Sequence, residues 1–416
     1  MQGGGFSSFF DLAKHHSASD PVWKHSERDP ELHQAQINME RLSTRHQSML
    51  YMVLIMIFSI FTLMALVYPL SYREQERQNF KPRRLRRAVE PKVNRSFIYP
   101  RRKYMTACNQ RFGQVTIFIL HSSKNTGVYL NIMKKTVDCY AKETNYTLLR
   151  VDIDTDDRIN LACSRHKMQR FKKFCAVAEY LKETDWMLVI DEGTGIVNPS
   201  HCIEEWIDER VNLILFEKFY NWDVSDDSYL VRFSEWSINF LQELASKEFT
   251  QVGLNNYNNG HLLAYLVETL RNGSVDHQVC IKQWQTIFGH DVSSACARLL
   301  LGYQHVWQGA VKIYRKAHGW IRNAMVTDNF WCDSDFMLSD WREESIERSA
   351  DVGGDELCEM TGLRWKWLPN KLTNCTQIRD NFQAYEYMKR RNYPEQATEF
   401  LREREVWHCY PQCEND

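Results

Sequence analysis

One uninterrupted apolar run constrains this chain more than any other feature. The 22 residues Met49–Leu70 contain no Asp, Glu, Lys, Arg or His. As a helix rising about 1.5 Å per residue, the run covers a hydrocarbon core about 30 Å thick. A cleavable signal peptide fits less well because 48 residues precede the run, and a buried core helix would carry a polar stripe. The sequence predicts a transmembrane signal anchor at 49–70 behind a cytoplasmic tail at 1–48.

Cysteines and glycosylation signals all lie on one side of this run. The chain has 12 cysteines, and every one follows the predicted span. An even number of cysteines on one side of a membrane indicates disulfides in an oxidising compartment, although their spacing does not pair them. Four N-glycosylation sequons also follow the span, at Asn94, Asn145, Asn272 and Asn374. Together these features predict a single-pass type II glycoprotein of the Golgi or another secretory-pathway membrane, with its C-terminal domain luminal.

The charges that flank the span favour the opposite orientation. Residues 29–48 carry two Lys or Arg and residues 71–92 carry eight, whereas the cytoplasmic flank normally holds the excess. Within the basic stem at 71–107, Arg84–Arg87 has the form that furin-like proteases cut, and cleavage there would release a secreted domain. The alternative is a solvated basic stem that attracts anionic headgroups. The net charge of −1 gives no reason to expect nucleic acid as a partner.

Beyond the stem, strand patterns alternate with helix patterns. Val115–His121 is a short apolar run typical of a buried strand, residues 126–143 have helical spacing, and Tyr146–Ile153 predicts a second strand. Further expected elements are a helix at 164–183, strands at Trp186–Ile190 and Val211–Phe216, and a helix at 234–246. This alternation predicts an α/β sandwich with a parallel sheet and a ligand crevice at the carboxyl ends of its strands. We expect this domain at 108–345 and a cysteine-containing extension at 346–416.

The segment around the third expected strand carries the most specific pattern. Residues 186–199, Trp-Met-Leu-Val-Ile-Asp-Glu-Gly-Thr-Gly-Ile-Val-Asn-Pro, resemble the metal-site segment of nucleotide-diphosphosugar transferases. The resemblance is to the galactosyl- and mannosyltransferase-like family of type II Golgi enzymes, and most closely to a related nematode family of unassigned function. Further similar stretches follow in the same order: Glu217–Trp222 with Tyr229–Arg232, Asn258–Gly260, Gly319–Arg322 and Asp335–Arg342.

The resemblance implies a glycosyltransferase-A-like, Rossmann-type fold that transfers a sugar from a nucleotide-diphosphate donor to a glycan acceptor. In the resembled enzymes Mn²⁺ usually offsets the charge of the leaving diphosphate, held by two carboxylates two residues apart and commonly by a histidine. This chain keeps Asp191 but has Gly193 and Ser339 at the other two positions. Glu192 would face away from Asp191 on an extended backbone. We therefore expect a degraded metal site. Its remaining ligands would be Asp191 and Asp340, the residue that follows Ser339.

Protein cations offer a second way to neutralise a diphosphate. The basic segment Arg165–Lys173 precedes the metal-site strand and resembles a basic segment of the relatives. The candidate donor-binding and phosphate-binding residues are Asp191, Thr194, Arg165, Arg170, Lys173 and Asn259. Plainer alternatives are a solvated helix face for the basic segment, a turn cap for Asp191 and core packing for the C-terminal tryptophans. Two functions remain open: a glycosyltransferase, or a catalytically inactive relative that serves as a luminal binding or scaffolding module.

Overall fold

The computed structural model describes residues 108–125, 127–219, 223–250, 260–271, 289–343, 346, 360–361, 364–365, 369–390 and 410–411. All of these residues belong to the unit Ser96–Asp416. No helix among them is long and apolar enough to span a membrane. The predicted anchor Met49–Leu70, the tail, the stem and Arg84–Arg87 lie outside the described residues and stay predictions, as do the predicted domain boundaries.

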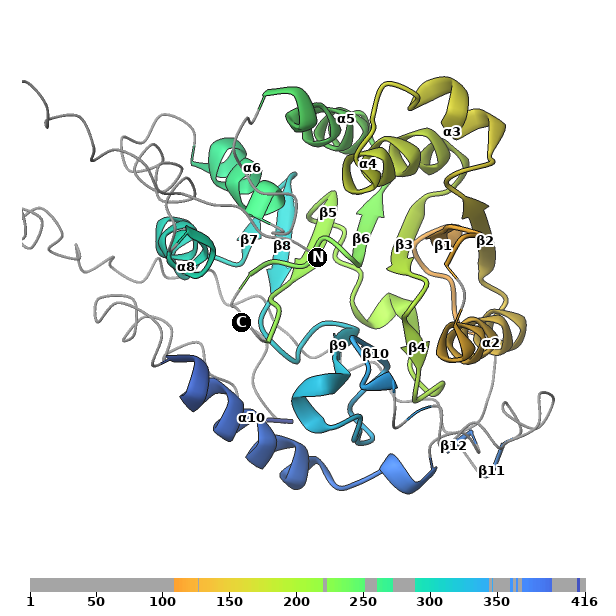
Figure 1. Ribbon diagram of the computed structural model, residues 1–416, viewed down its shortest axis with the longest axis vertical. Coiled ribbons are helices and arrows are strands. Elements are labelled where there is room, and N and C mark those ends of the chain that lie inside the picture. Colours follow the sequence, from red (N-terminus) through yellow and green to blue (C-terminus); the bar gives the residue numbers. More distant parts are fainter. Residues whose placement is uncertain are drawn as a thin grey trace, which may run out of the picture. The chain divides into compact units, whose positions relative to one another are not determined.

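In the described part of the chain, a seven-stranded mixed sheet forms the centre of the fold, with strand order β2-β1-β3-β6-β5-β8-β7 (Figure 1). Its strands are β1 Val115–His121, β2 Thr147–Asp152, β3 Trp186–Asp191, β5 Leu213–Phe216, β6 Tyr229–Arg232, β7 Val306–Trp307 and β8 Val311–Tyr314. β1 pairs in parallel with β2 and β3, and β5 with β8. β6 runs antiparallel to both β3 and β5. β7 is antiparallel to β8. The predicted α/β architecture is confirmed, but the expectation of a parallel sheet is wrong at β6 and β7.

Helices cover both faces of this sheet. They are α2 Val128–Thr144, α3 Asp157–Ala162, α4 Gln169–Tyr180, α5 Glu235–Thr250, α6 Gly260–Leu270 and α8 Gly289–Leu301. Because successive strand residues point to opposite faces, Ile117 and Ile119 of β1 pack in one core with Val137 of α2. Phe118 of β1 packs in the opposite core, where α4 contributes Val177. Figure 1 shows α2 on one side of β1–β3 and α4 with α5 on the other.

A smaller sheet joins segments that are far apart in sequence. It contains β4 Gly195–Ile196, β9 Ile321–Asn323 and β10 Met337–Ser339. β10 pairs antiparallel with β4, where Leu338 lies opposite Gly195, and parallel with β9, where Ser339 lies opposite Asn323. Three of the stretches that carry the family resemblance therefore meet in this sheet, directly after the end of β3.

The C-terminal part of the chain packs against this region. α10 (Cys375–Arg390) stacks Phe382 on Phe219, with ring centroids 4.3 Å apart. The ammonium of Lys316 lies 3.3 Å from the Glu386 carboxylate, and both side chains are fully buried. The remaining elements are β11 Met360–Thr361, β12 Arg364–Trp365 and the 3-10 helices Leu181–Glu183, Ile203–Glu205, Ala324–Thr327 and Pro369–Lys371.

Disulfides tie these layers together. They join Cys108 to Cys202, Cys163 to Cys175 and Cys332 to Cys375. Cys139 and Cys296 are also disulfide-bonded, so no cysteine in the described ranges is a free thiol. The sequence prediction of disulfides is confirmed for these residues. Cys332–Cys375 links the loop before β10 to the start of α10, which holds part of the predicted extension against the domain.

Candidate functional site

The chain reverses at the carboxyl end of β3. The backbone N–H of Thr194 donates to the carbonyl of Asp191 at 3.0 Å, which closes a four-residue turn from Asp191 to Thr194. The extended backbone expected here ends at Asp191, and that expectation is wrong for Glu192 to Thr194. Asp191 and Glu192 nevertheless have different partners: Lys173 donates to Asp191, and the Asn125 amide donates to Glu192. Trp341 Nε1, two residues beyond β10, donates to the Gly193 carbonyl at 3.0 Å and so ties the turn to the end of the small sheet.

Two basic side chains of α4, Lys173 and Arg170, point toward the end of β3, where this turn begins. Lys173 Nζ lies 2.5 Å from Asp191 Oδ1, and about a third of each side chain is exposed, 32% and 33%. Arg170 is one helical turn earlier on the same face of α4. Its Nε lies 3.6 Å from Asp226 Oδ2. The helix therefore presents an ammonium and a guanidinium to carboxylates at the edge of the sheet.

Asp226 and Asp227 reach this edge because of the reversal at β6. Tyr229 at the start of β6 pairs with Val189 near the end of β3, so the residues that precede β6 lie beside the end of β3. Lys218, which follows β5, places Nζ 2.5 Å from Asp227 Oδ2 and 3.6 Å from Asp226 Oδ1. The ion-pair cluster, as we name it, consists of Arg170, Lys173, Lys218, Asp191, Asp226 and Asp227.

Burial and neighbouring charges set the ionisation of the cluster. Burial raises the pKa of Asp226 to about 7, and the Asp227 carboxylate adds to the rise. Burial also raises the pKa of Asp191, against the opposing effect of Lys173. Desolvation also raises the pKa of Asp227, but the positive charge of Lys218 outweighs this effect, so the pKa of Asp227 lies below its usual value. Desolvation lowers the pKa of Lys173, but Asp191 outweighs it, so that pKa is raised and the ammonium stays charged.

Asp340 completes the surroundings of the turn. Its backbone is in the left-handed region, with φ of 50°, and the Asn323 amide donates to its carboxylate. Burial raises the pKa of Asp340, and the negative charges of Asp227 and Asp191 add to the rise. Asp340 therefore lies within electrostatic reach of the ion-pair cluster while its carboxylate is bound to an amide.

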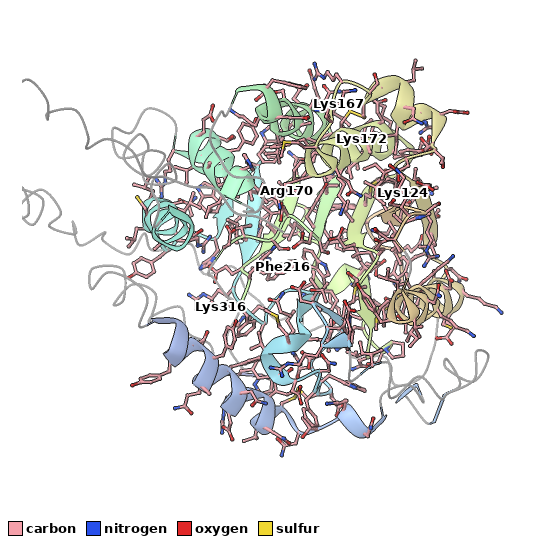
Figure 2. The ribbon with its side chains drawn as sticks, in the orientation of Figure 1. Lys124, Lys167, Arg170, Lys172, Phe216 and Lys316 are labelled. Atoms are coloured by element: carbon pink, nitrogen blue, oxygen red, sulfur yellow. A yellow bond between two sulfur atoms is a disulfide. The ribbon has the colours of Figure 1, made fainter. Side chains whose placement is uncertain are left out.

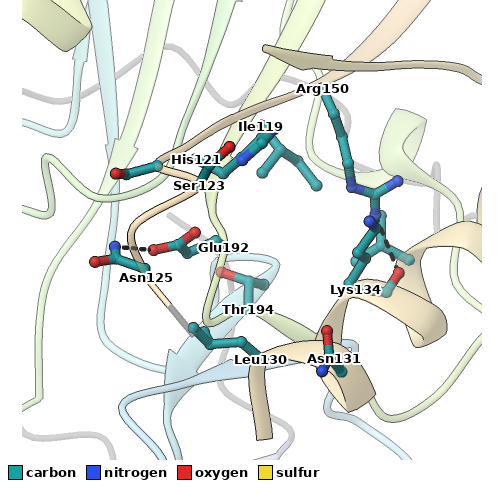
Figure 3. Close-up of a pocket in the computed structure, with 12 residues that line it drawn as sticks. Ile119, His121, Ser123, Asn125, Leu130, Asn131, Lys134, Arg150, Glu192 and Thr194 are labelled. Carbon is teal, nitrogen blue, oxygen red and sulfur yellow. Dashed lines mark hydrogen bonds between the residues drawn. The ribbon is translucent and has the colours of Figure 1, made fainter. Parts of the chain in front are cut away.

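A pocket of about 260 Å³ opens beside the same turn, between β1, β2 and α2 (Figure 3). We call it the α2 pocket; its lining includes Ile119, Ser123, Leu130, Lys134, Arg150 and Thr194. Glu192 also faces it, while Arg150 pairs with Asp138 of α2. The Thr194 side chain is 2% exposed, and within the described ranges its hydroxyl has no hydrogen-bond partner. Buried polar groups are normally hydrogen-bonded, so this enclosed hydroxyl is an unsatisfied polar group in the pocket wall.

The predicted site residues lie in different parts of the structure. Arg170, Lys173 and Asp191 meet in the ion-pair cluster, Asp340 lies near it, and Thr194 lines the α2 pocket. Arg165 contacts His166 and the ring of Phe249 instead. Lys167 and Lys172 donate to the backbone carbonyls of Ser164 and Ile153 (Figure 2). Asn259 lies outside the described residues. Trp320, Trp331 and Trp341, which belong to the C-terminal tryptophans, are buried and pack in the core.

The residues at the turn do not form a set of ligands that fits Mn²⁺. This ion prefers several oxygen ligands that are free to coordinate. Here the Lys173 ammonium donates a hydrogen bond to the Asp191 carboxylate, and the Asn323 amide donates one to the Asp340 carboxylate. Within the described ranges, the one group of three potential ligands with atoms within 4.8 Å of one another is Cys108, Cys202 and Glu204. Its two cysteines share a disulfide, so it is no metal site either.

These features define an α/β protein with a polar crevice at the carboxyl end of a central strand. A family model described as "Protein of unknown function, DUF273" matches residues 137–353, just over half of the chain, and the chain belongs to that family. The comparison with curated proteins gives no match. Among solved structures, the chain is similar to a "crystal structure of a glycosyltransferase involved in the glycosylation of the major capsid of PBCV-1", with 13% identity and a TM-score of 0.33, over 57% of this chain and 100% of that one.

Proposed function

We propose that this chain is a glycosyltransferase-A-type protein that binds a nucleotide-diphosphosugar and passes its sugar to a glycan acceptor. The observation that carries the proposal is the turn from Asp191 to Thr194, which has the α2 pocket beside it and the cations of the ion-pair cluster at its start. Ligands of open α/β sheets bind in the crevice outside the carboxyl ends of the strands. The resemblance of residues 186–199 to a donor-site segment points to the same place.

The two parts of the site suit the two parts of such a donor. The α2 pocket offers hydroxyls, amides and an apolar floor that includes Ile119 and Leu130, which suits a nucleoside or sugar. Asp191 and Thr194 are the ends of one turn, so their Cα atoms lie within about 7 Å. A diphosphate that leaves the pocket along this turn reaches Lys173, whose ammonium has three donors.

A binding protein without transferase activity is the second candidate. Gly193 and Ser339 have no ligand side chains where the resembled enzymes hold metal, and Lys173 binds the Asp191 that remains. Such a protein would keep the donor or glycan site and lose the chemical step. Release of nucleotide diphosphate in the presence of glycan acceptors separates the two candidates, because a pure binding module releases none.

Donor binding should raise the melting temperature of the full chain purified in detergent. At a donor concentration about 100 times the Kd, binding stabilises the folded state by about 2.7 kcal/mol. The panel contains uridine, guanosine and cytidine diphosphosugars, each tested with Mn²⁺ and with EDTA. Thr194→Val keeps the side-chain shape and removes the unpartnered hydroxyl, so it should reduce the shift. Lys172→Met should leave the shift unchanged, because Lys172 donates to the Ile153 carbonyl and not to the ion-pair cluster. No shift with any donor, with or without metal, contradicts the proposed function.

We also propose that the domain works in the lumen of the secretory pathway, which its disulfides and sequons support. Asn145 and Asn374 are both exposed, whereas Asn94 and Asn272 lie outside the described residues. We expect glycans at both exposed sites of the cell-expressed protein, seen as a mobility shift after glycosidase treatment. Thr147→Ala and Thr376→Ala should each remove one step of that shift, and the matched Thr→Ser changes, which keep the sequons, should not. An unchanged mobility would place the domain on the cytosolic side.

A further inference from the structure

The ion-pair cluster carries its own counter-charges. It contains three carboxylates, Asp191, Asp226 and Asp227, and three cations supplied by α4 and by the residue after β5. When all six of these groups are ionised, their charges sum to zero before any ligand arrives. Among the described residues, two further acidic side chains act on the cluster: Asp223, whose charge raises the pKa of Asp226, and Asp340, whose carboxylate accepts a hydrogen bond from the Asn323 amide.

Within the cluster, Lys173 lies where a metal ion bound to Asp191 would lie. Its ammonium lies 2.5 Å from Asp191 Oδ1, against the one carboxylate that the metal-site resemblance retains. A divalent ion at Asp191 would have to displace this ammonium and would then meet the like charge of Lys173. The structure offers no compensation, because Gly193 and Ser339 provide no carboxylate or imidazole.

We propose that Lys173 is a built-in counter-ion that takes the place of an exchangeable divalent metal beside Asp191. Given the proposed function, on which this step rests, the same ammonium also faces the donor diphosphate. Lys173 remains about one-third exposed, and within the described residues its only hydrogen bond is the one to Asp191. Two of its three N–H groups are therefore available to phosphate oxygens. Donor binding should then be the same with Mn²⁺ and with EDTA.

Direct binding of Mn²⁺ to the full chain, followed by electron paramagnetic resonance without nucleotide, tests the counter-ion itself. We expect no saturable binding to the natural protein at about 1 mM metal. Lys173→Met removes the ammonium, frees Asp191 and should strengthen Mn²⁺ binding about tenfold or more. Lys172→Met is the matched control, because Lys172 donates to the Ile153 carbonyl on the other side of α4. Lys173→Arg keeps the charge and should behave as the natural protein does.

A double variant sharpens the test. Among the described residues, a Cβ at Gly193 would have one neighbour within 4 Å, Tyr129 Cε2 at 3.9 Å, which is an ordinary van der Waals contact. Lys173→Met with Gly193→Asp supplies a second carboxylate and should bind Mn²⁺ more tightly than Lys173→Met alone. Far-UV circular dichroism confirms that each variant is folded, and an unfolded Lys173→Met variant shifts the comparison to Lys173→Arg against Lys173→Gln.

The outcomes separate this inference from the proposed function. Two results would contradict the proposed counter-ion role of Lys173: saturable Mn²⁺ binding by the natural protein, or equal Mn²⁺ affinity of the Lys173→Met and Lys172→Met variants. Donor binding that EDTA abolishes overturns it as well. If no donor binds under any condition, the proposed function fails, while the Mn²⁺ comparison still decides the role of Lys173. Donor binding that resists EDTA and weakens about tenfold in Lys173→Met supports both.

Discussion

Replacing Asp335 with asparagine should lower the free energy of unfolding by about 3–5 kcal/mol, because it leaves the Arg322 guanidinium buried without its counter-charge. Arg322 Nε and Nη2 donate to the two oxygens of Asp335 at 2.6 and 2.7 Å. The side chains are 3% and 4% exposed. Asp335 also accepts the backbone N–H of Cys332 at 2.8 Å, so asparagine preserves the shape of the site but removes the charge that offsets the guanidinium.

The matched control lies in the same part of the chain. Asp328 pairs with Arg342 at 3.5 Å, and both side chains are more than half exposed. Asp328→Asn should therefore cost less than about 1 kcal/mol, and asparagine suits the left-handed backbone there. Urea unfolding of the purified protein measures both. Equal losses for the two variants would show that the Arg322–Asp335 pair is not buried as described. A large loss at Asp335 alone would assign these two motif residues to holding β9 and β10 together.

The motif residues therefore divide into two groups that sequence could not separate. The stretches Gly319–Arg322 and Asp335–Arg342 belong to the same resemblance as residues 186–199, yet Arg322 and Asp335 bind each other. From sequence alone, a charged residue in a family motif signals a site and a buried ion pair equally well. The pairing of β9 with β10 decides the matter, and it depends on contacts between residues distant in sequence.

The strands were predictable where the pattern is local. β1 has the predicted bounds Val115–His121, and the strand at Trp186 extends by one residue to Asp191. Short apolar runs of this kind are buried on both faces of a sheet, which makes them readable without knowledge of the fold. The two cations of α4 that reach the site, Arg170 and Lys173, were among the candidates, but the pattern did not distinguish them from Arg165.

Lys218 lies in the matched stretch Glu217–Trp222 but was not among the candidates, whereas Asp226 and Asp227 were missed for a physical reason. An alternation of strands and helices predicts parallel strands, whose carboxyl ends alone carry the site. β6 runs antiparallel to β3, so the residues before its first position, rather than those after its last, lie at the crevice. The adjacent acidic pair Asp226-Asp227 just before an apolar strand was the available signal, but it acquires meaning only once the direction of β6 is known.

Asp226→Asn should stabilise the protein near pH 8 and leave its stability almost unchanged near pH 4. The folded-state pKa of Asp226 is about 7, against about 3.9 in an unfolded chain. Between these values the folded state holds a proton that the unfolded state has lost, so stability falls as the pH rises to about 7 and stays lower above it. Asparagine resembles the protonated acid and avoids this loss. A shift of this size corresponds to about 4 kcal/mol at most.

The neighbouring variant should show the opposite sign. Lys218 lowers the pKa of Asp227 in the folded state, so the Asp227 carboxylate contributes stability above its unfolded pKa, and that stability is lost as the pH falls through the folded value. Asp227→Asn should therefore destabilise the protein at neutral pH and have little effect in acid. Urea unfolding makes the comparison, at pH values from 4 to 8 for Asp226→Asn and down to about pH 2 for Asp227→Asn, because the contribution of Asp227 is lost only below its unfolded pKa. If Asp226→Asn destabilises the protein near pH 8, Asp226 is a charged partner of Lys218 and Arg170, and the cluster then holds three full negative charges at neutral pH.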